Sequence, residues 1–153
     1  GGAEGVLLTQ GNRHCGYALY MKDGHLHYVH NYQNLERFRV SSGSPVPTGE
    51  VTLRYEFEPT GAPDFAQGKG APGRSQLYVN GNLVASLEQP YTVSTFLGII
   101  GLSCGYAAVD SVDPERFQAP FSFTGHIKQV VLDVSGELIV DHKAELDRMM
   151  AEQ

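Results

Sequence analysis

The chain has 153 residues, of which 41% are hydrophobic, and it carries a formal net charge of −6. This length suits one domain with one core, and the apolar content excludes an intrinsically disordered chain. The acidic balance, with basic residues that form no run, argues against a nucleic-acid partner. Because no apolar stretch approaches the roughly 20 residues of a membrane helix, we also expect no membrane partner. The sequence therefore predicts a single domain over residues 1–153.

Apolar and polar residues alternate with period two in the first part of the chain, which predicts strands. The first expected strand covers residues 5–10. Residues 16–22 and 26–32 are expected to form a hairpin around Asp23-Gly24, because Gly accepts positive φ without Cβ strain. A further strand is expected at 36–41. In the strand 16–22 one face should carry Tyr17, Leu19 and Met21, and the other Ala18, Tyr20 and Lys22.

The middle of the chain repeats this pattern after a loop at 42–49. Residues 51–58 alternate cleanly and predict a half-buried strand. Residues 59–74 are rich in Gly and Pro and predict an exposed, mobile loop. Two further strands, 76–79 and 83–87, flank Asn80-Gly81, and this dipeptide between apolar runs is the strongest short-range hairpin signal.

The last third of the chain predicts more strands and one helix. Strands are expected at 96–102, 121–124 and 126–134, with a long loop at 103–119. A helix is expected at 141–153, where Asp141 caps the N-terminus and Leu146, Met149 and Met150 form an apolar stripe. With 18 Gly and 8 Pro spread along the chain as turn residues, the pattern predicts an all-β sandwich with one short C-terminal helix.

Two groups of carboxylates are candidates for chemistry. Glu56 and Glu58 lie two residues apart on one strand and point to the same side, as in a glycosidase pair, but the row begins with Arg54, so a solvated charged face is favoured. Asp110, Asp113 and Glu115 cluster in a loop and offer oxygen ligands for calcium without the EF-hand pattern. An ordinary turn at Asp113-Pro114 is the simpler interpretation.

Histidines and cysteines are the other candidates. His25 and His27 have the His-x-His spacing that zinc sites use, while His30 points to the opposite face, and nothing in the sequence indicates a third ligand. Cys15 and Cys104 are expected to be free buried residues, with one disulfide as the alternative. No nucleophile elbow or dinucleotide motif occurs, and Gly68-Lys69-Gly70 is not a phosphate loop. We assign no catalytic, cofactor-binding or metal-binding residue.

Aromatic side chains offer a non-enzymatic alternative, a carbohydrate-binding sandwich module. Tyrosine rings stack on sugars, although burial in strands explains most tyrosines in a sandwich. The candidate residues are Tyr28, Tyr32, Tyr55, Tyr78, Tyr91 and Tyr106.

Several segments, in order, resemble the C-terminal domain of bacterial arylsulfatases of the alkaline phosphatase-like superfamily. Each segment alone is a generic strand or turn signal, and their order and spacing carry the resemblance, which covers nearly the whole chain. The segments are GAEGVL at 2–7, Gly16-Tyr17, Tyr20, KDG at 22–24, residues 28–31, LRYEF at 53–57, LYVNG at 77–81, PFSFTGHIKQV at 120–130 and the tail 133–153.

The resemblance implies a concanavalin A-like (jelly-roll) sandwich that packs against the catalytic sulfatase domain of the same polypeptide. The family's catalytic motif, Cys- or Ser-x-Pro-x-Arg, does not occur around Cys15 or Cys104, so no catalytic residue is carried over. Residues 105–107 are Gly-Tyr-Ala where the family tends to have Gly-Arg-Asp. The resemblance further implies that a strand normally precedes Gly1. We therefore expect a non-catalytic fragment of a longer sulfatase, with self-association through an unpaired edge as an additional hypothesis.

Overall fold

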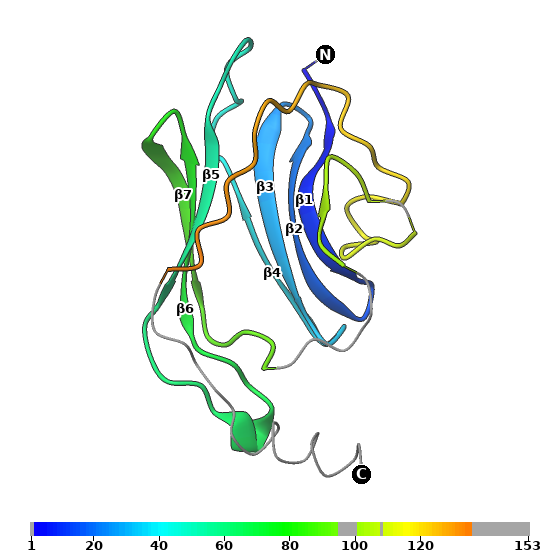
Figure 1. Ribbon diagram of the computed structural model, residues 1–153. Helices are drawn as coiled ribbons and strands as arrows, with labels where there is room; N and C mark the ends of the chain where they lie inside the picture. Colours follow the sequence, from blue (N-terminus) through cyan, green and yellow to red (C-terminus); the bar gives the residue numbers. More distant parts are fainter. Residues whose placement is uncertain (1, 95–100, 108, 136–153) are drawn as a thin grey trace.

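The computed structural model describes residues 2–94, 101–107 and 109–135, and these residues form two antiparallel β-sheets that face each other (Figure 1). One sheet has five strands in the order β4-β3-β2-β1-β8, and the other has three in the order β5-β6-β7. The sandwich-like, all-β architecture expected from the sequence is thus confirmed in the described residues. The strands are β1 (Gly5–Asn12), β2 (Cys15–Lys22), β3 (His25–Tyr32), β4 (Glu36–Ser41), β5 (Leu53–Pro59), β6 (Gly73–Val79), β7 (Asn82–Gln89) and β8 (Ser103–Cys104).

Both expected hairpins are present. The β2–β3 turn places Asp23 and Gly24 at φ of 50° and 77°, and the β6–β7 turn places Asn80 and Gly81 at 50° and 80°. Positive φ at both central residues matches the right-handed twist of the flanking strands, which explains why Asp-Gly and Asn-Gly occur there. Each sheet is therefore built from neighbours in sequence, and only β8 joins from a distance, at the free edge of β1.

The inner core lies between the two sheets. It combines one face of β2, β3 and β4 with one face of β6, and Leu26 and Leu77 are completely buried there. The ring of Tyr28 stacks on Tyr55 of the opposite sheet with 3.7 Å between the centroids, which joins the two layers. The face of β2 predicted to carry Tyr17, Leu19 and Met21 is indeed the one that packs in this core.

A second core lies on the outer face of the five-stranded sheet, which points away from the three-stranded sheet. Residues 105–107 and 109–121, called the segment 105–121 below, are irregular, run across this face and bury it. Ala18, Tyr20 and Val29 of the sheet pack there against Val112 and Phe117 of the segment. The two central strands therefore bury side chains on both faces, so a solvated face, as in a half-buried strand, does not occur on β2 and β3.

Two of the strands expected near the end are not present, which corrects the sequence prediction. Residues 121–124 are extended and bond to both neighbours, because Phe121 N–H donates to the Ala107 carbonyl and Val6 N–H to the Phe121 carbonyl. They form only an isolated parallel bridge, between Val6 and Ser122. Residues 126–134 have strand-like composition but form no ladder with another described residue, since β-propensity favours an extended backbone and does not supply a partner.

Other expectations differ in detail or fall outside the description. The segment 59–74 is not simply an exposed loop: it contains a 3-10 turn, η1 (Phe65–Gln67), Ala71 is buried, and its last residues start β6. Most of the expected strand 96–102 and the whole expected helix 141–153 lie outside the described residues. Within the described ranges, no helix has the length and apolar character that crossing a membrane requires.

Candidate functional site

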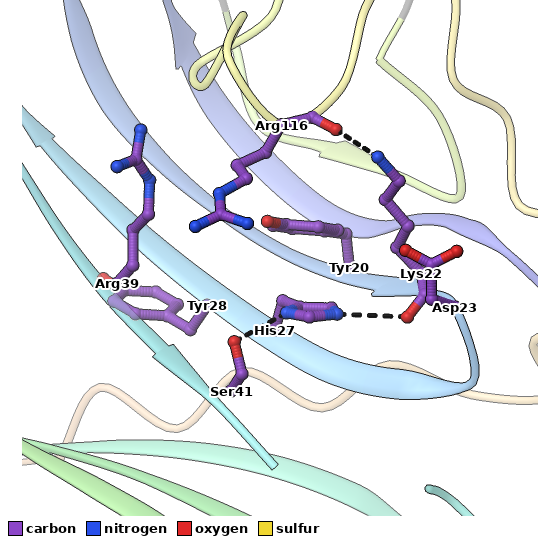
Figure 2. A pocket seen from close by; sticks show the side chains of 8 residues that line it. All are labelled: Tyr20, Lys22, Asp23, His27, Tyr28, Arg39, Ser41 and Arg116. Carbon is purple, nitrogen blue, oxygen red and sulfur yellow. Dashed lines mark hydrogen bonds between the residues drawn. The ribbon is translucent and has the colours of Figure 1, made fainter. Parts of the chain in front are cut away.

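A small polar cavity lies on the outer face of the five-stranded sheet, beside the β2–β3 turn and under the segment 105–121 (Figure 2). Its volume is about 80 Å³. The strands supply its floor, and the segment supplies Arg116 at its rim. The lining residues are Tyr20, Lys22, Asp23, His27, Tyr28, Arg39, Ser41 and Arg116.

The register of three strands places the floor residues in one row. Tyr20 of β2 pairs with His27 of β3, and His27 pairs with Ser41 of β4. Directly paired residues point to the same side of a sheet, so the three side chains meet on the outer face. The Tyr20 and His27 rings stack with 5.0 Å between their centroids. The row is thus a direct product of the Asp23-Gly24 turn, which fixes the β2–β3 register.

A buried ion-pair network holds the overlying segment in place. Asp113 has no exposed surface, and the Arg39 guanidinium donates to both of its carboxylate oxygens, at 2.6 and 2.7 Å. Arg39 also donates to Glu115, at 2.7 Å. Arg37 lies 3.8 Å from Asp113 and pairs with Glu115 at 3.3 Å. Two arginines and two carboxylates compensate each other, which anchors the segment immediately before Arg116.

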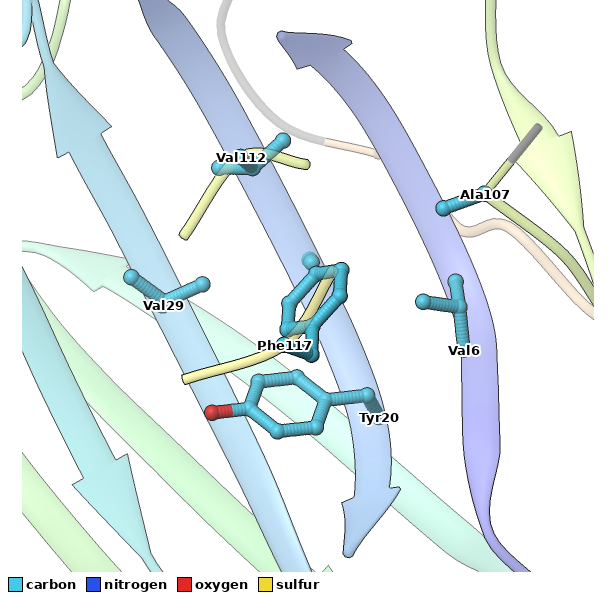
Figure 3. Packing of buried hydrophobic residues seen from close by; sticks show 7 residues of the cluster. Val6, Tyr20, Val29, Ala107, Val112 and Phe117 are labelled. Atoms are coloured by element: carbon cyan, nitrogen blue, oxygen red, sulfur yellow. The ribbon is translucent and has the colours of Figure 1, made fainter. Parts of the chain in front are cut away.

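An aromatic contact completes this anchor. The ring of Phe117 packs on Tyr20 with 4.9 Å between the centroids, and Figure 3 shows both rings among the aliphatic side chains of the outer core. Phe117 is buried and follows Arg116 directly. The guanidinium at the rim therefore extends from a backbone that is fixed on both sides, by Asp113 and by Phe117.

His27 is held as a neutral ring by its two hydrogen bonds and its burial. Nε2 lies 3.1 Å from the Lys22 carbonyl, which only accepts, so Nε2 carries the proton. Nδ1 then accepts from the Ser41 hydroxyl at 2.7 Å. Burial lowers the pKa of His27 most, the hydrogen bond to Lys22 raises it, and the neighbouring His25 lowers it further. The Ser41 oxygen keeps its lone pairs, and its proton is committed to His27.

Tyr20 presents its hydroxyl to the cavity. The residue is 3% exposed, and its hydroxyl has no hydrogen-bond partner within the described residues. Burial raises the pKa of Tyr20 to about 12, Asp113 raises it as well, and Arg116 and Arg39 act in the opposite direction. The phenol therefore stays protonated at neutral pH and remains a donor.

The charges around the cavity do not balance. The Lys22 ammonium donates to the Arg116 carbonyl at 2.6 Å, so it is hydrogen-bonded but not neutralised by that bond. The Arg116 guanidinium has no ion pair within the described residues. Asp23 is the acidic residue in the lining. With Arg39 compensated by its own carboxylates, Lys22 and Arg116 exceed Asp23 by one positive charge.

The carboxylates singled out in the sequence are all engaged by arginines. Glu56 pairs with Arg54 and Glu58 with Arg74, each at 3.4 Å and on an exposed face, as the solvated-face interpretation expects. Asp110 receives two nitrogens of Arg13, about 3 Å away. Asp113 and Glu115 belong to the network of Arg37 and Arg39 and do not join Asp110 in one site.

The histidines and cysteines do not assemble into a cluster either. His25 bonds to the Ser42 carbonyl, and His30 faces the inner side, where its Nε2 accepts from the Val93 N–H. Across the described ranges, no group of three or more His, Cys, Asp or Glu side chains is arranged to hold a metal ion. Both cysteines are free, but only Cys15 is buried, so the expectation of a buried Cys104 was wrong.

Most of the tyrosines considered for sugar binding already contact other side chains of the protein. Tyr28 and Tyr55 stack in the inner core, and Tyr32 is buried against Tyr91. Tyr78 lies under the guanidinium of Arg54, at 3.9 Å, and Tyr91 donates to Glu36. Tyr106 differs, since it is 48% exposed and lines a second, shallower hollow of about 190 Å³ next to β1 and β8.

Comparisons with known proteins give no relative for this chain: no protein-family model, no curated protein and no solved structure matches it. The arylsulfatase resemblance therefore rests on the sequence segments alone.

Proposed function

We propose that this chain is a non-catalytic accessory domain of an arylsulfatase, a concanavalin A-like (jelly-roll) sandwich that packs against the catalytic domain of the same polypeptide. Two lines of support come from different levels. The ordered sequence segments cover nearly the whole chain, and the two facing antiparallel sheets agree with the all-β sandwich class to which the implied fold belongs. Because a fold alone does not define a function, the proposal also needs support from the surface of the domain.

One observation carries the proposal: an apolar run lies on the surface of the described part of the chain. Val130, Val131, Leu132 and Val134 are 42%, 74%, 55% and 94% exposed. The segment is extended and follows Lys128, whose ammonium pairs with Glu50 just before β5. Contiguous exposed apolar residues on a soluble domain mark an interaction surface. A second domain that covered this run would bury its apolar side chains.

The ionic groups support a structural rather than a catalytic role. Glu56 and Glu58, the pair considered for acid–base chemistry, are each paired with an arginine. The loop carboxylates considered as calcium ligands are paired with arginines as well, and Asp113 holds the overlying segment in place. A general acid or base needs a free carboxyl within reach of substrate.

Two measurements test the proposal: the coding sequence upstream of this chain, and the binding of this chain to the expected catalytic domain. The coding sequence upstream of Gly1 should contain a Cys/Ser-x-Pro-x-Arg motif, and the catalytic domain expressed separately should bind this chain. The double variant Val131→Asp/Val134→Asp should weaken that binding at least tenfold, because charges would enter a buried apolar contact. Leu35→Asp is the matched control, since Leu35 is 75% exposed at the remote β3–β4 turn.

Three outcomes contradict the proposal. An upstream sequence without the motif removes the sulfatase assignment. Equal loss of binding in the Leu35 control removes the assignment of the interface. Hydrolysis of an aryl sulfate by the purified chain alone, after formylglycine-generating treatment, removes its non-catalytic character.

A second candidate function, a carbohydrate-binding module, is favoured by Tyr106. Its half-exposed ring lines the second hollow together with Thr9 and Ser103, and an aromatic face among polar residues suits a pyranose. Screening on a glycan array, with Tyr106→Ala as the comparison, tests it. Saturable binding lost in the variant supports this function, and an array without specific signals excludes it.

A further inference from the structure

We propose that the cavity under Arg116 binds one oxyanion group, the shared chemistry of a sulfate, a phosphate or a carboxylate. The inference does not depend on the accessory-domain function, because it rests on the geometry of the cavity itself. Arg116 and Lys22 supply the opposite charge, and the Tyr20 hydroxyl supplies a hydrogen bond from the floor.

The cationic side chains of the cavity differ in whether a carboxylate already neutralises them. The Arg39 guanidinium is hydrogen-bonded to Asp113 and Glu115, so its charge contributes little to the binding of a ligand. Lys22 bonds to a carbonyl, and Arg116 has no ion pair within the described part of the chain. Asp23 offsets one of these two charges. An excess of positive charge therefore persists at this cavity in a protein whose net charge is −6.

The acidic neighbours do not close the site to an anion. The Glu4 carboxylate accepts from the Asp23 backbone N–H at 3.0 Å and is not part of the cavity lining. Asp113 is buried behind Arg39 and is fully engaged there. An oxyanion in the cavity therefore faces the Arg116 and Lys22 charges first.

The hydrogen-bond step follows from Tyr20. Its side chain is buried, and its hydroxyl opens on the cavity without a partner in the described residues. An oxygen atom of a ligand in the cavity can therefore accept a hydrogen bond from this hydroxyl. Figure 2 shows the Tyr20 hydroxyl and the Arg116 guanidinium pointing into the same space, above His27. Together they offer an N–H fork and an O–H.

The size of the cavity selects for a small group. At about 80 Å³ it has room for several waters, since one water needs roughly 10–15 Å³ of such space. A tetrahedral oxyanion, which has the size of a few waters, fits this space. The cavity therefore recognises the charged substituent of a ligand, with the remainder of the ligand outside the rim.

Titration calorimetry of the whole chain with inorganic sulfate at low ionic strength tests the proposal, with phosphate and acetate as competitors for the same site. We expect one saturable site, and the anion that displaces sulfate at the lowest concentration identifies the preferred group. Arg116→Gln should raise the Kd for sulfate about tenfold or more, because it removes a charge-assisted hydrogen bond. Tyr20→Phe should raise the Kd several-fold and keep the packing of the ring.

The control Arg74→Gln makes the same change of charge on the three-stranded sheet, at an exposed residue outside the cavity. We expect its Kd to equal that of the parent chain. Urea unfolding of each variant separates loss of binding from loss of folding. An unchanged Kd in Arg116→Gln, or an equal increase in Arg74→Gln, overturns the proposal, as does a failure of sulfate, phosphate and acetate to bind the folded parent chain.

Discussion

Asp113 and Arg39 form a two-pronged ion pair in which one carboxylate, without exposed surface, receives two guanidinium nitrogens at 2.6 and 2.7 Å. The pair joins residues on β4 and on the segment 105–121, far apart in the sequence. Removing one partner of a buried pair leaves the other charge uncompensated. The anchor of the outer segment therefore depends on this contact.

Asp113→Ala should lower the free energy of unfolding by about 3–5 kcal/mol, because Arg39 and Arg37 would lose their buried counter-charge. Urea denaturation followed by far-UV circular dichroism measures this loss. Glu115→Ala is the matched control: its carboxylate shares the same arginines but is 63% exposed, so we expect a loss of about 1 kcal/mol or less. Similar losses in the two variants would contradict the importance of burial.

His30 should make the protein less stable as the pH falls. Burial lowers its pKa to about 4, whereas an unfolded His titrates near 6.5. Between these two pKa values the unfolded state binds a proton on His30 and the folded state does not. The contribution is fully present above about pH 6.5 and is lost progressively toward pH 4, in total on the order of 3 kcal/mol.

Unfolding free energies measured from pH 7 to pH 4 test this expectation. In His30→Gln the amide oxygen can still accept from the Val93 N–H, so the slope over this window should flatten. His14→Gln, at an exposed turn residue, should keep the parent slope. If the His30 and His14 variants have the same slope, His30 is not the group responsible.

Gly5→Ala should destabilise the protein by at least about 1–3 kcal/mol. Gly5 has φ of 121°, and a Cβ there would lie 2.3 Å from the Ser122 carbonyl oxygen, so the backbones of β1 and residues 121–124 would have to separate. Gly2→Ala is a close control, because a Cβ at Gly2 meets nothing within 4 Å. Thermal unfolding should show a lower Tm for the first variant alone. A Tm equal to that of the parent in Gly5→Ala would disprove the close approach.

The two cysteines should differ in reactivity. Cys104 is exposed and Cys15 is buried, and both are free. A thiol reagent should therefore modify one equivalent in the native protein and two in denaturant, since access limits the reaction of the buried thiol. Cys104→Ser should remove the native reaction, and Cys15→Ser should keep it. Protection of both thiols in the native state would contradict the exposure of Cys104.

The local parts of the fold follow from the sequence. Asp23-Gly24 and Asn80-Gly81 form the turns that their φ preferences require, and the alternation in β5 reappears in its burial, with Tyr55 inward and Glu56 outward. These features depend on contacts between close neighbours in the chain, which period and turn chemistry describe.

The remaining errors concern distant contacts. Nothing near Tyr20 in the sequence indicates that Phe117 covers it, so the second core was missed. The apolar pattern of 126–134 predicted a strand, but a strand needs a hydrogen-bonding partner that local pattern does not specify.

The candidate site was missed for the same reason. Arg116 reaches the cavity from a segment far along the chain, and the place of Lys22 on a strand face does not indicate this contact. The sequence contains one indirect indication of the site, the cluster of acidic residues in the loop before Arg116. In the structure, Asp113 and Glu115 of this cluster form ion pairs with Arg39 and Arg37.

The strands β2 and β3 are buried on both faces, and this limits which substitutions the sequence can accept during evolution. On the three-stranded sheet, positions such as Glu56 and Glu58 face solvent and can exchange with other polar residues at little cost. On the central hairpin, neither face of the strands offers such freedom, because a replacement meets the inner core on one side and the outer segment on the other. Among relatives of this chain, neutral variation should therefore accumulate in β5 to β7, while β2 and β3 change slowly and mostly together with residues 105–121.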